Sequence, residues 1–179
     1  MRLFEESGDR ENAIWSLSHQ ADLCREEGHE AEARALYHQA LAQFRALGFS
    51  HGVASCLHDL AGFEVAEGRF EEARRLYREC IRLYGAENKA DLPRVLESMA
   101  AAALEMRRPE KALMFTGAAA AMRERFHVRI GNPARAAEIE QWIARARKET
   151  GPQASAHWMK GWNMSVEELV AWASREGEE

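Results

Sequence analysis

The residues of this chain that could do chemistry are its histidines, cysteines and serines, which supply metal ligands and nucleophiles. None of the seven histidines stands in an H-E-x-x-H arrangement or beside a pair of cysteines, so the spacing predicts no metal site. Cys56 and His58 lie two residues apart, and side chains at that spacing on a helix face different directions. Ser55 has no better-placed base. We therefore expect no catalytic centre and no cofactor, and we keep a hydrolase as the remote alternative.

The charged residues follow patterns that helices explain. Glu71-Glu72 and Glu167-Glu168 stand at predicted helix starts, where the helix dipole favours acidic groups. Arginines alternate with glutamates between residues 69 and 82 at spacings of three and four, which predicts ion pairs within one helix. A second basic cluster is interpreted as a solvated face, with an acidic partner as the alternative. Its members are Arg123, Arg125, Arg129, Arg145, Arg147 and Lys148.

The composition is that of a folded, soluble, cytoplasmic protein. Hydrophobic residues make up 46% of the chain and its net charge is −5, which disfavours direct binding to nucleic acid. No apolar run approaches the ~18 residues that a membrane span needs, and the first ten residues carry no signal-peptide pattern. The odd number of cysteines, all within helical patterns, predicts buried, reduced thiols at Cys24, Cys56 and Cys80.

These residues are placed on a pattern that repeats every forty positions. The segments 21–37 and 61–77 carry the same residue type at eight places, and a weaker copy follows from Ala100, with Arg107 where glycine is expected. A fixed period of this length predicts an array of helix pairs. Glycine would close the first helix of each pair, and a small alanine five residues later would let the second helix pack closely. The shared residues in the first copy are Ala21, Glu27, Gly28, Glu32, Ala33, Arg34, Leu36 and Tyr37.

Residues that typically begin or end helices define the predicted helix boundaries. A turn is predicted at Gly8 and Asp9, and a loop over residues 85–90. Asp91 is expected to cap a helix with Pro93 in its first turn, and Asn132 another. A capping box of Ser165 and Glu168 is expected to open the last helix. The predicted helices are Arg2–Ser7, Glu11–Glu27, His29–Leu47, His51–Glu67, Arg69–Tyr84, Asp91–Met106, Pro109–Phe126, Pro133–Glu149, Gln153–Lys160 and Val166–Arg175.

The repeat resembles the tetratricopeptide repeat, which places a small residue, glycine, alanine and an aromatic residue at matching positions. That repeat is usually about 34 residues long, shorter than the period here. The resemblance implies an all-α fold, a right-handed α-solenoid of helix hairpins with a C-terminal capping region. About three pairs, preceded by a partial repeat, would occupy residues 1–130. Residues 131–179 would form capping helices of the same domain, in which Trp158, Trp162 and Trp172 close the end of the array.

The stretch from Phe115 onward resembles a narrower family, the signal-transduction ATPases of LuxR-type and AfsR-type transcriptional regulators. Residues 116–123 are similar to its "LLGAAEALRE" segment, and residues 156–171 to its "F…AW..G..MSLEEAV" ending. The resemblance implies a sensor or scaffold role, as the C-terminal repeat region of a larger regulator or a stand-alone relative. The chain has no G-x-x-x-x-G-K-[ST] loop, so ATP binding is not expected.

In tetratricopeptide arrays the first helix of each pair lines a concave groove, and carrying that register over predicts where a ligand sits. An extended peptide or a small polar effector would suit a tryptophan beside charged and polar groups. As the alternative, Trp15 packs beneath a repeat that precedes it. The candidate groove residues are Trp15, Ser18, Asp22, Arg25, Glu26, Ser55, His58, Gly62, Val65, Arg94, Glu97 and Ala101.

Two non-catalytic functions fit this pattern. The first is a protein- or peptide-binding repeat domain, the sensor or scaffold part of a bacterial transcriptional regulator. The second is a self-association module that forms a homodimer through its N-terminal end, between Met1 and Trp15. Neither requires a membrane or nucleic acid as a direct partner.

Overall fold

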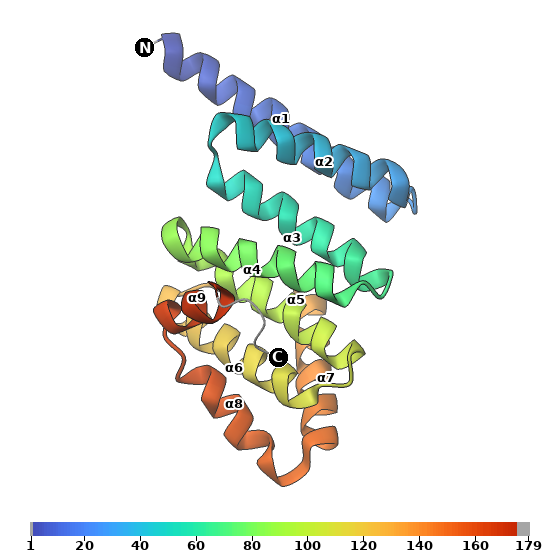
Figure 1. The fold of residues 1–179 in the computed structure, drawn as a ribbon, viewed down its shortest axis with the longest axis vertical. Coiled ribbons are helices and arrows are strands. Elements are labelled where there is room, and N and C mark those ends of the chain that lie inside the picture. The colour runs from blue at the N-terminus through green and yellow to red at the C-terminus, as the bar shows by residue number, and fades with distance from the viewer. Residues whose placement is uncertain (1, 175–179) are drawn as a thin grey trace. The chain divides into compact units, whose positions relative to one another are not determined.

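Every regular element in the described part of the chain is a helix (Figure 1). The computed structural model describes residues 2–174, with side chains for residues 10–172. The all-α class and the helix hairpins predicted from the sequence are confirmed. The elements are α1 (Arg2–Glu26), α2 (Glu30–Leu47), α3 (Ser50–Ala66), α4 (Phe70–Glu87), a 3-10 turn (Lys89–Asp91), α5 (Leu92–Glu105), α6 (Pro109–Phe126), α7 (Pro133–Thr150), a second 3-10 turn (Gly151–Gln153), α8 (Ala154–Trp162) and α9 (Val166–Ser174).

The first helix corrects one prediction. α1 runs without a break from Arg2 to Glu26, so the turn expected at Gly8 and Asp9 is absent. A glycine inside a helix costs about 1 kcal/mol relative to alanine, which weakens a helix but does not end it. No proline accompanies Gly8 to remove a backbone donor. The predicted partial repeat and the first predicted helix are therefore one element.

The glycines that were expected to close the first helix of each pair do so. Gly28 follows α1 with φ +82° and Gly68 follows α3 with φ +73°, a left-handed conformation that costs glycine nothing. The amide of the next residue then bonds back to the helix, as His29 N does to Cys24 O over 2.7 Å. In the third copy Arg107 adopts φ +57°, so the turn is kept even where the glycine is missing.

The loop predicted over residues 85–90 is also corrected. α4 continues to Glu87, and only then does a short 3-10 turn lead into α5. Gly85 is a packing residue: a Cβ atom built on it would lie 2.3 Å from a methyl group of Val170 in α9. Asp91 is at the N-cap of α5, as predicted, although its side chain makes no capping hydrogen bond. Asn132 caps α7 by accepting from the Ala134 amide.

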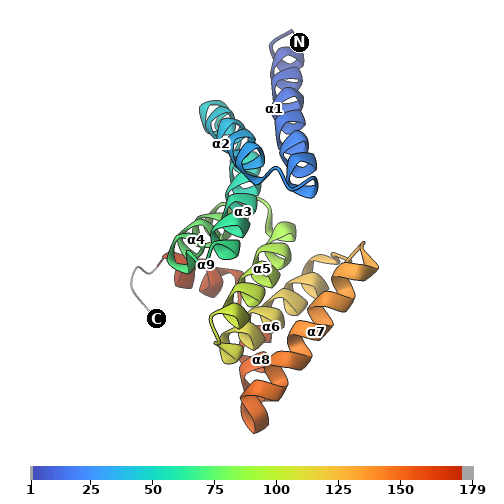
Figure 2. The same ribbon diagram turned by 90° about the vertical axis from the view of Figure 1, so that its right-hand side faces the viewer.

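Contacts divide the chain into two compact units, residues 1–76 and residues 77–179. In the first unit α1 packs against α2, and α2 against α3 (Figure 2). In the second, α6 is central and packs against α5, α7 and α8. The small alanines predicted to allow close packing, Ala33 and Ala112, are buried, as is Tyr37. The division into repeats over residues 1–130 and a cap over residues 131–179 stays a prediction.

Two glycines hold the C-terminal helices together. A Cβ atom at Gly117 in α6 would lie 2.1 Å from the carbonyl oxygen of Trp158 in α8. One at Gly161 in α8 would lie 1.8 Å from the carbonyl oxygen of Met114 in α6. The backbones of α6 and α8 therefore cross in direct contact, which only glycine allows at both positions.

The last helix begins with the capping box that the sequence predicts. The Glu168 amide donates to Ser165 Oγ over 3.0 Å, and the Ser165 amide donates to Glu168 Oε2 over 2.8 Å. Trp158 and Trp162 stack with ring centroids 5.0 Å apart, whereas Trp172 meets Phe115. The predicted helix end at Arg175 lies outside the described residues.

Candidate ligand-binding face

The candidate groove residues lie on three helices. Those of α1 and α3 belong to the first unit, and Arg94, Glu97 and Ala101 lie on α5 in the second. α1 and α3 meet where Ser18 Oγ lies 3.7 Å from Cys56 Sγ, and both residues are buried. Ser18 is therefore a core residue between the two helices and not a surface one. The face of the first unit must be formed by the residues on either side of this contact.

On α1, Asp22 is the best-placed polar group. It accepts a hydrogen bond from the Tyr37 hydroxyl of α2 and lies 3.3 Å from the Arg25 guanidinium. Burial raises the pKa of Tyr37, and the bond to Asp22 and the charge of Asp59 raise it further, so this hydroxyl stays protonated and donates. Asp22 is thus held in place while its side chain keeps 42% of its exposure. Arg25 and Glu26, the last two residues of α1, are exposed.

On α3, one stripe of half-buried residues runs along the helix. Ser55, Asp59 and Gly62 follow each other at spacings of four and three, so they share a face. His58 lies beside them, with its Nδ1 atom 3.3 Å from Asp59 Oδ1. Val65 continues the helix as a half-buried residue. Asp59 was missed in the sequence analysis, although its spacing from Ser55 and Gly62 was a signal that could have found it.

Trp15 is surrounded by rings of its own unit. It is half-buried, with centroid distances of 4.9 Å to Phe44, 5.6 Å to His51 and 6.3 Å to Phe49. Phe49 lies in the connection between α2 and α3, and His51 is the second residue of α3. Sequence reasoning did not include Phe49. These ring contacts leave Trp15 only partly buried. We name the resulting surface the α1–α3 face; it consists of Trp15, Asp22, Ser55, His58, Asp59 and Gly62.

Cys56 cannot act as the nucleophile that the sequence raised as an alternative. Its side chain is buried against Ser18, and burial raises the pKa of the thiol to about 11. A thiol with so high a pKa is protonated at neutral pH and is a poor nucleophile. Within the described residues, no group of three or more histidine, cysteine and carboxylate side chains could hold a metal ion. Cys24 and Cys80 are buried too, as predicted.

The candidates on α5 make internal contacts. Glu97 is only 3% exposed and accepts from the Arg123 guanidinium of α6 over 2.7 Å. Burial raises the pKa of Glu97, and the bond to Arg123 opposes that shift. Arg94 donates to the Tyr84 hydroxyl over 3.1 Å, and Ala101 is half-buried. Glu97 is therefore part of a buried ion pair within the second unit and is not a groove residue.

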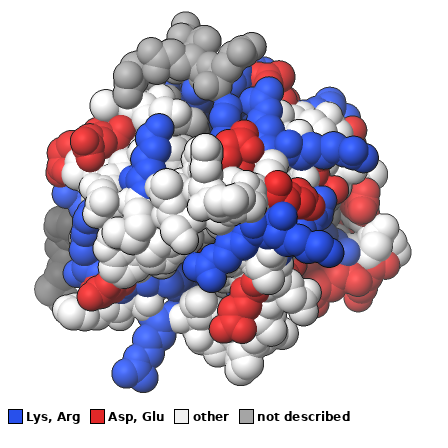
Figure 3. Space-filling view, turned by 90° about the horizontal axis from the view of Figure 1, so that it is seen from below, with Lys and Arg blue, Asp and Glu red and all other residues white. Residues whose placement is uncertain are grey.

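Three of the six residues in the predicted basic cluster, Arg123, Arg125 and Arg145, bond to their own chain. Arg125 donates to the carbonyl oxygen of Met164 over 3.0 Å. Arg145 donates to Glu149 over 3.0 Å and lies 3.4 Å from Glu105. Figure 3 shows basic side chains interleaved with acidic and neutral ones on one face of the molecule. The predicted ion pairs within α4, Arg74 with Glu71 and Arg75 with Glu72, are confirmed.

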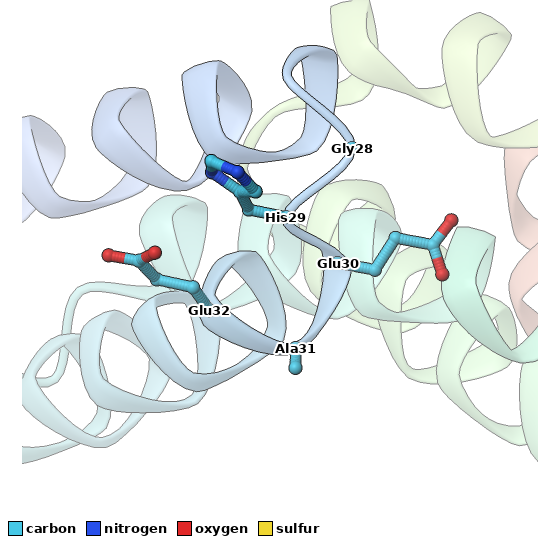
Figure 4. A pocket seen from close by; sticks show the side chains of 5 residues that line it. All are labelled: Gly28, His29, Glu30, Ala31 and Glu32. Atoms are coloured by element: carbon cyan, nitrogen blue, oxygen red, sulfur yellow. The ribbon is translucent and has the colours of Figure 1, made fainter.

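Two surface hollows lie away from the α1–α3 face. An open one of about 490 Å³ is lined by residues 28–32, which form the turn before α2 and the start of that helix. Figure 4 shows the carboxylates of Glu30 and Glu32 extending from it. A smaller one of about 240 Å³, which we name the α1–α2 hollow, lies between these helices. It is lined by Arg10, Ala13, Ile14, Gln43, Ala46 and Leu47.

Comparison with known proteins identifies the repeat. Residues 11–86 match the model of the tetratricopeptide repeat. The chain is also 31% identical over 84 residues to the regulatory protein AfsR of Streptomyces coelicolor. That overlap covers 47% of this chain but 8% of AfsR, so the chain spans less than a tenth of the relative. No solved structure matches. No helix within the described residues is both long and apolar enough to cross a membrane.

Proposed function

We propose that the chain, whose residues 11–86 match the tetratricopeptide repeat model, is a non-catalytic domain that binds a protein or peptide segment on its α1–α3 face. The observation that carries the proposal is the composition of that face. A half-buried tryptophan lies on the same surface as two carboxylates, a histidine and an unobstructed glycine. Aromatic anchors beside polar groups are typical of binding surfaces.

The wider role that we propose is that of a sensor or scaffold in a bacterial transcriptional regulator. The support is the partial similarity to the regulatory protein AfsR. In such a role the repeat would report the presence of its partner to domains elsewhere in the regulator. The domain itself would perform no reaction, in keeping with the protonated, buried thiol of Cys56.

Capture of partners by the full chain tests the proposal. The immobilised wild-type chain is compared with a variant that carries Trp15→Ala, Asp22→Ala and Arg25→Ala. We expect the variant to lose the partners that the wild type retains. A matched variant, His38→Ala and Gln39→Ala on the exposed side of α2, should retain them. Equal recovery by all three chains would remove the α1–α3 face from the function.

The α1–α2 hollow favours self-association as a second candidate function. Its lining includes Ala13, Ala46 and Leu47, and Leu47 is 37% exposed. Light scattering over a range of concentrations tests this. A dimer that Leu47→Asp turns into a monomer would support it, whereas a wild-type chain that is monomeric throughout would exclude it. Met1 and the side chains of residues 2–9, which the predicted dimer contact includes, lie outside the described ones.

A further inference from the structure

We propose that the α1–α3 face receives a basic segment of the partner protein, with a lysine or arginine beside the carboxylates of Asp22 and Asp59 and above Gly62. The inference rests on the proposed function, because it names the chemistry of the segment that binds there. Three observations carry it: the charge of the first unit, the convergence of the two carboxylates, and the open space over Gly62.

The first unit is much more acidic than the second. Residues 1–76 contain 14 acidic and 8 basic residues, whereas residues 77–179 contain 15 acidic and 16 basic residues. The whole excess of negative charge in this chain therefore belongs to the unit that carries the α1–α3 face. A field of one sign over a binding surface attracts partners of the opposite sign and speeds their association.

Asp22 and Asp59 come from different helices but act on the same groups. The negative charges of both raise the pKa of Tyr37 and the pKa of Cys56, in each case adding to the effect of burial. Ser18 of α1 lies 3.7 Å from Cys56 of α3. Asp22 follows Ser18 by four positions and Asp59 follows Cys56 by three, so each carboxylate lies one helical turn beyond this contact. Each keeps acceptor capacity, because a carboxylate has about four lone-pair sites. Asp22 uses part of its capacity for Tyr37 and Arg25, and Asp59 for His58.

Partial burial makes these carboxylates attract a cation more strongly than fully exposed surface charges do. The side chain of Asp59 is 16% exposed and that of Asp22 is 42% exposed. Charges that are partly withdrawn from water are screened less and interact more strongly. An arriving ammonium or guanidinium group would be attracted to both, and the acceptors are fixed in position by Tyr37 and His58.

Gly62 leaves room for the incoming chain. It lies inside α3 with ordinary helical geometry, where glycine costs about 1 kcal/mol relative to alanine. Its absent side chain is not required by packing, since a Cβ atom there would meet nothing within 4 Å. Gly52 of the same helix differs, because a Cβ atom would lie 2.5 Å from the ring of Phe44. The space over Gly62 lets a partner backbone approach α3 next to Asp59.

The test is a nuclear magnetic resonance titration of the full chain with a short peptide of alternating lysine and serine. The same peptide with acetylated lysines, which has the shape but not the charge, is the reference. We expect the lysine peptide to shift the amide signals of Gly62 and Ser55, and the acetylated peptide to leave them in place. Shifts of equal size with both peptides, or none with either, would overturn the inference.

Single substitutions test whether the lysine peptide binds on the α1–α3 face. Asp59→Asn should weaken binding of the lysine peptide about five-fold, as expected for loss of one partly buried ion pair. Asp22→Asn, which keeps an acceptor for Tyr37, should do the same. The matched control Glu30→Gln with Glu32→Gln removes two carboxylates from the first turn of α2 and should change affinity by less than about two-fold. If that control weakens binding as much, the attraction is unspecific and the inference is wrong.

Gly62→Leu separates binding from folding. The leucine fills the space over α3, so we expect binding of the lysine peptide to be lost while the melting temperature is unchanged or higher. Retained binding by a folded Gly62→Leu chain would overturn the docking geometry. If captured partners depend on Trp15 but not on Asp22 and Asp59, the proposed function stands and only the basic segment is wrong.

Discussion

At the scale of single residues, Arg107 shows the conformational cost of replacing the glycine of the repeat. Its φ of +57° belongs to the left-handed region, which disfavours residues with a Cβ atom by about 1–2 kcal/mol. We predict that Arg107→Gly raises the free energy of unfolding by about 0.5–1 kcal/mol. The gain is smaller than the strain removed, because glycine also gains entropy in the unfolded chain, which favours unfolding. Denaturant titration measures this.

The matched control is Gly68→Ala. Gly68 has φ +73° and no neighbour within 4 Å of a Cβ atom, so the cost is one of backbone alone. We expect Gly68→Ala to lower the free energy of unfolding by about 1 kcal/mol. A loss of stability in Arg107→Gly would show that the arginine side chain has a structural role that outweighs its backbone strain.

Glu64 makes the stability of the first unit depend on pH. It is buried in α3 and bonded to Arg69 and Arg34, which hold its pKa below the ordinary value of 4.5. The pKa of Glu64 is lower in the folded chain than in the unfolded chain. The ionised Glu64 therefore stabilises the fold fully at pH values above its unfolded pKa, and this stabilisation is lost as the pH falls through its folded pKa.

We predict that Glu64→Gln lowers the free energy of unfolding by about 2 kcal/mol at neutral pH. The difference from the wild type should shrink as the pH falls below 4.5. The exposed pair of Glu71 and Arg74 supplies the control, and Glu71→Gln should cost less than about 0.5 kcal/mol. A Glu64→Gln deficit that stays constant from neutral to acid pH would contradict the assignment.

At the scale of elements, the crossing of α6 and α8 depends on two glycines. We predict that Gly117→Ala and Gly161→Ala each destabilise the second unit by about 3 kcal/mol, because the added carbon meets backbone atoms that cannot move aside. Thermal unfolding followed by tryptophan fluorescence measures the loss, since Trp158 and Trp162 lie on α8.

Gly62→Ala is the control for this pair. All three glycines are helical, but Gly62 has open space where the others have backbone contacts. We therefore expect Gly62→Ala to stabilise the chain by about 1 kcal/mol, the difference in helix propensity. Equal losses of stability in all three variants would contradict this prediction. They would mean that the backbone contacts between α6 and α8 are not what makes Gly117 and Gly161 necessary.

The elements also show what the sequence can predict. Gly28, Gly68 and the capping box of Ser165 and Glu168 were identified correctly because caps act over a few neighbouring residues. The break at Gly8 was wrong because glycine alone resembles a turn whether or not the helix continues. Gly85 and Gly117 were not recognised as contact points, since the helices that approach them are distant in sequence. The burial of Ser18 and Glu97 likewise depends on neighbours that no local pattern reveals.

At the scale of the whole molecule, the acidic excess of residues 1–76 predicts how binding responds to salt. A surface whose attraction comes largely from charge loses affinity as ionic strength rises, because the Debye length shrinks from about 10 Å at 0.1 M salt to about 3 Å at 1 M. Apolar contacts from Trp15 would be much less affected. Partner capture should therefore weaken, but not vanish, at high salt.

The most direct test of the account is photo-cross-linking from the α1–α3 face of the full chain in its source cell. A photoreactive residue is placed at Ser55, within the face, or at His38, on the exposed side of α2. We predict a discrete cross-linked protein from position 55 that disappears when Asp22 and Asp59 are changed to asparagine, and none from position 38. Cross-links from position 38 alone, or products from position 55 that survive these substitutions, would contradict it.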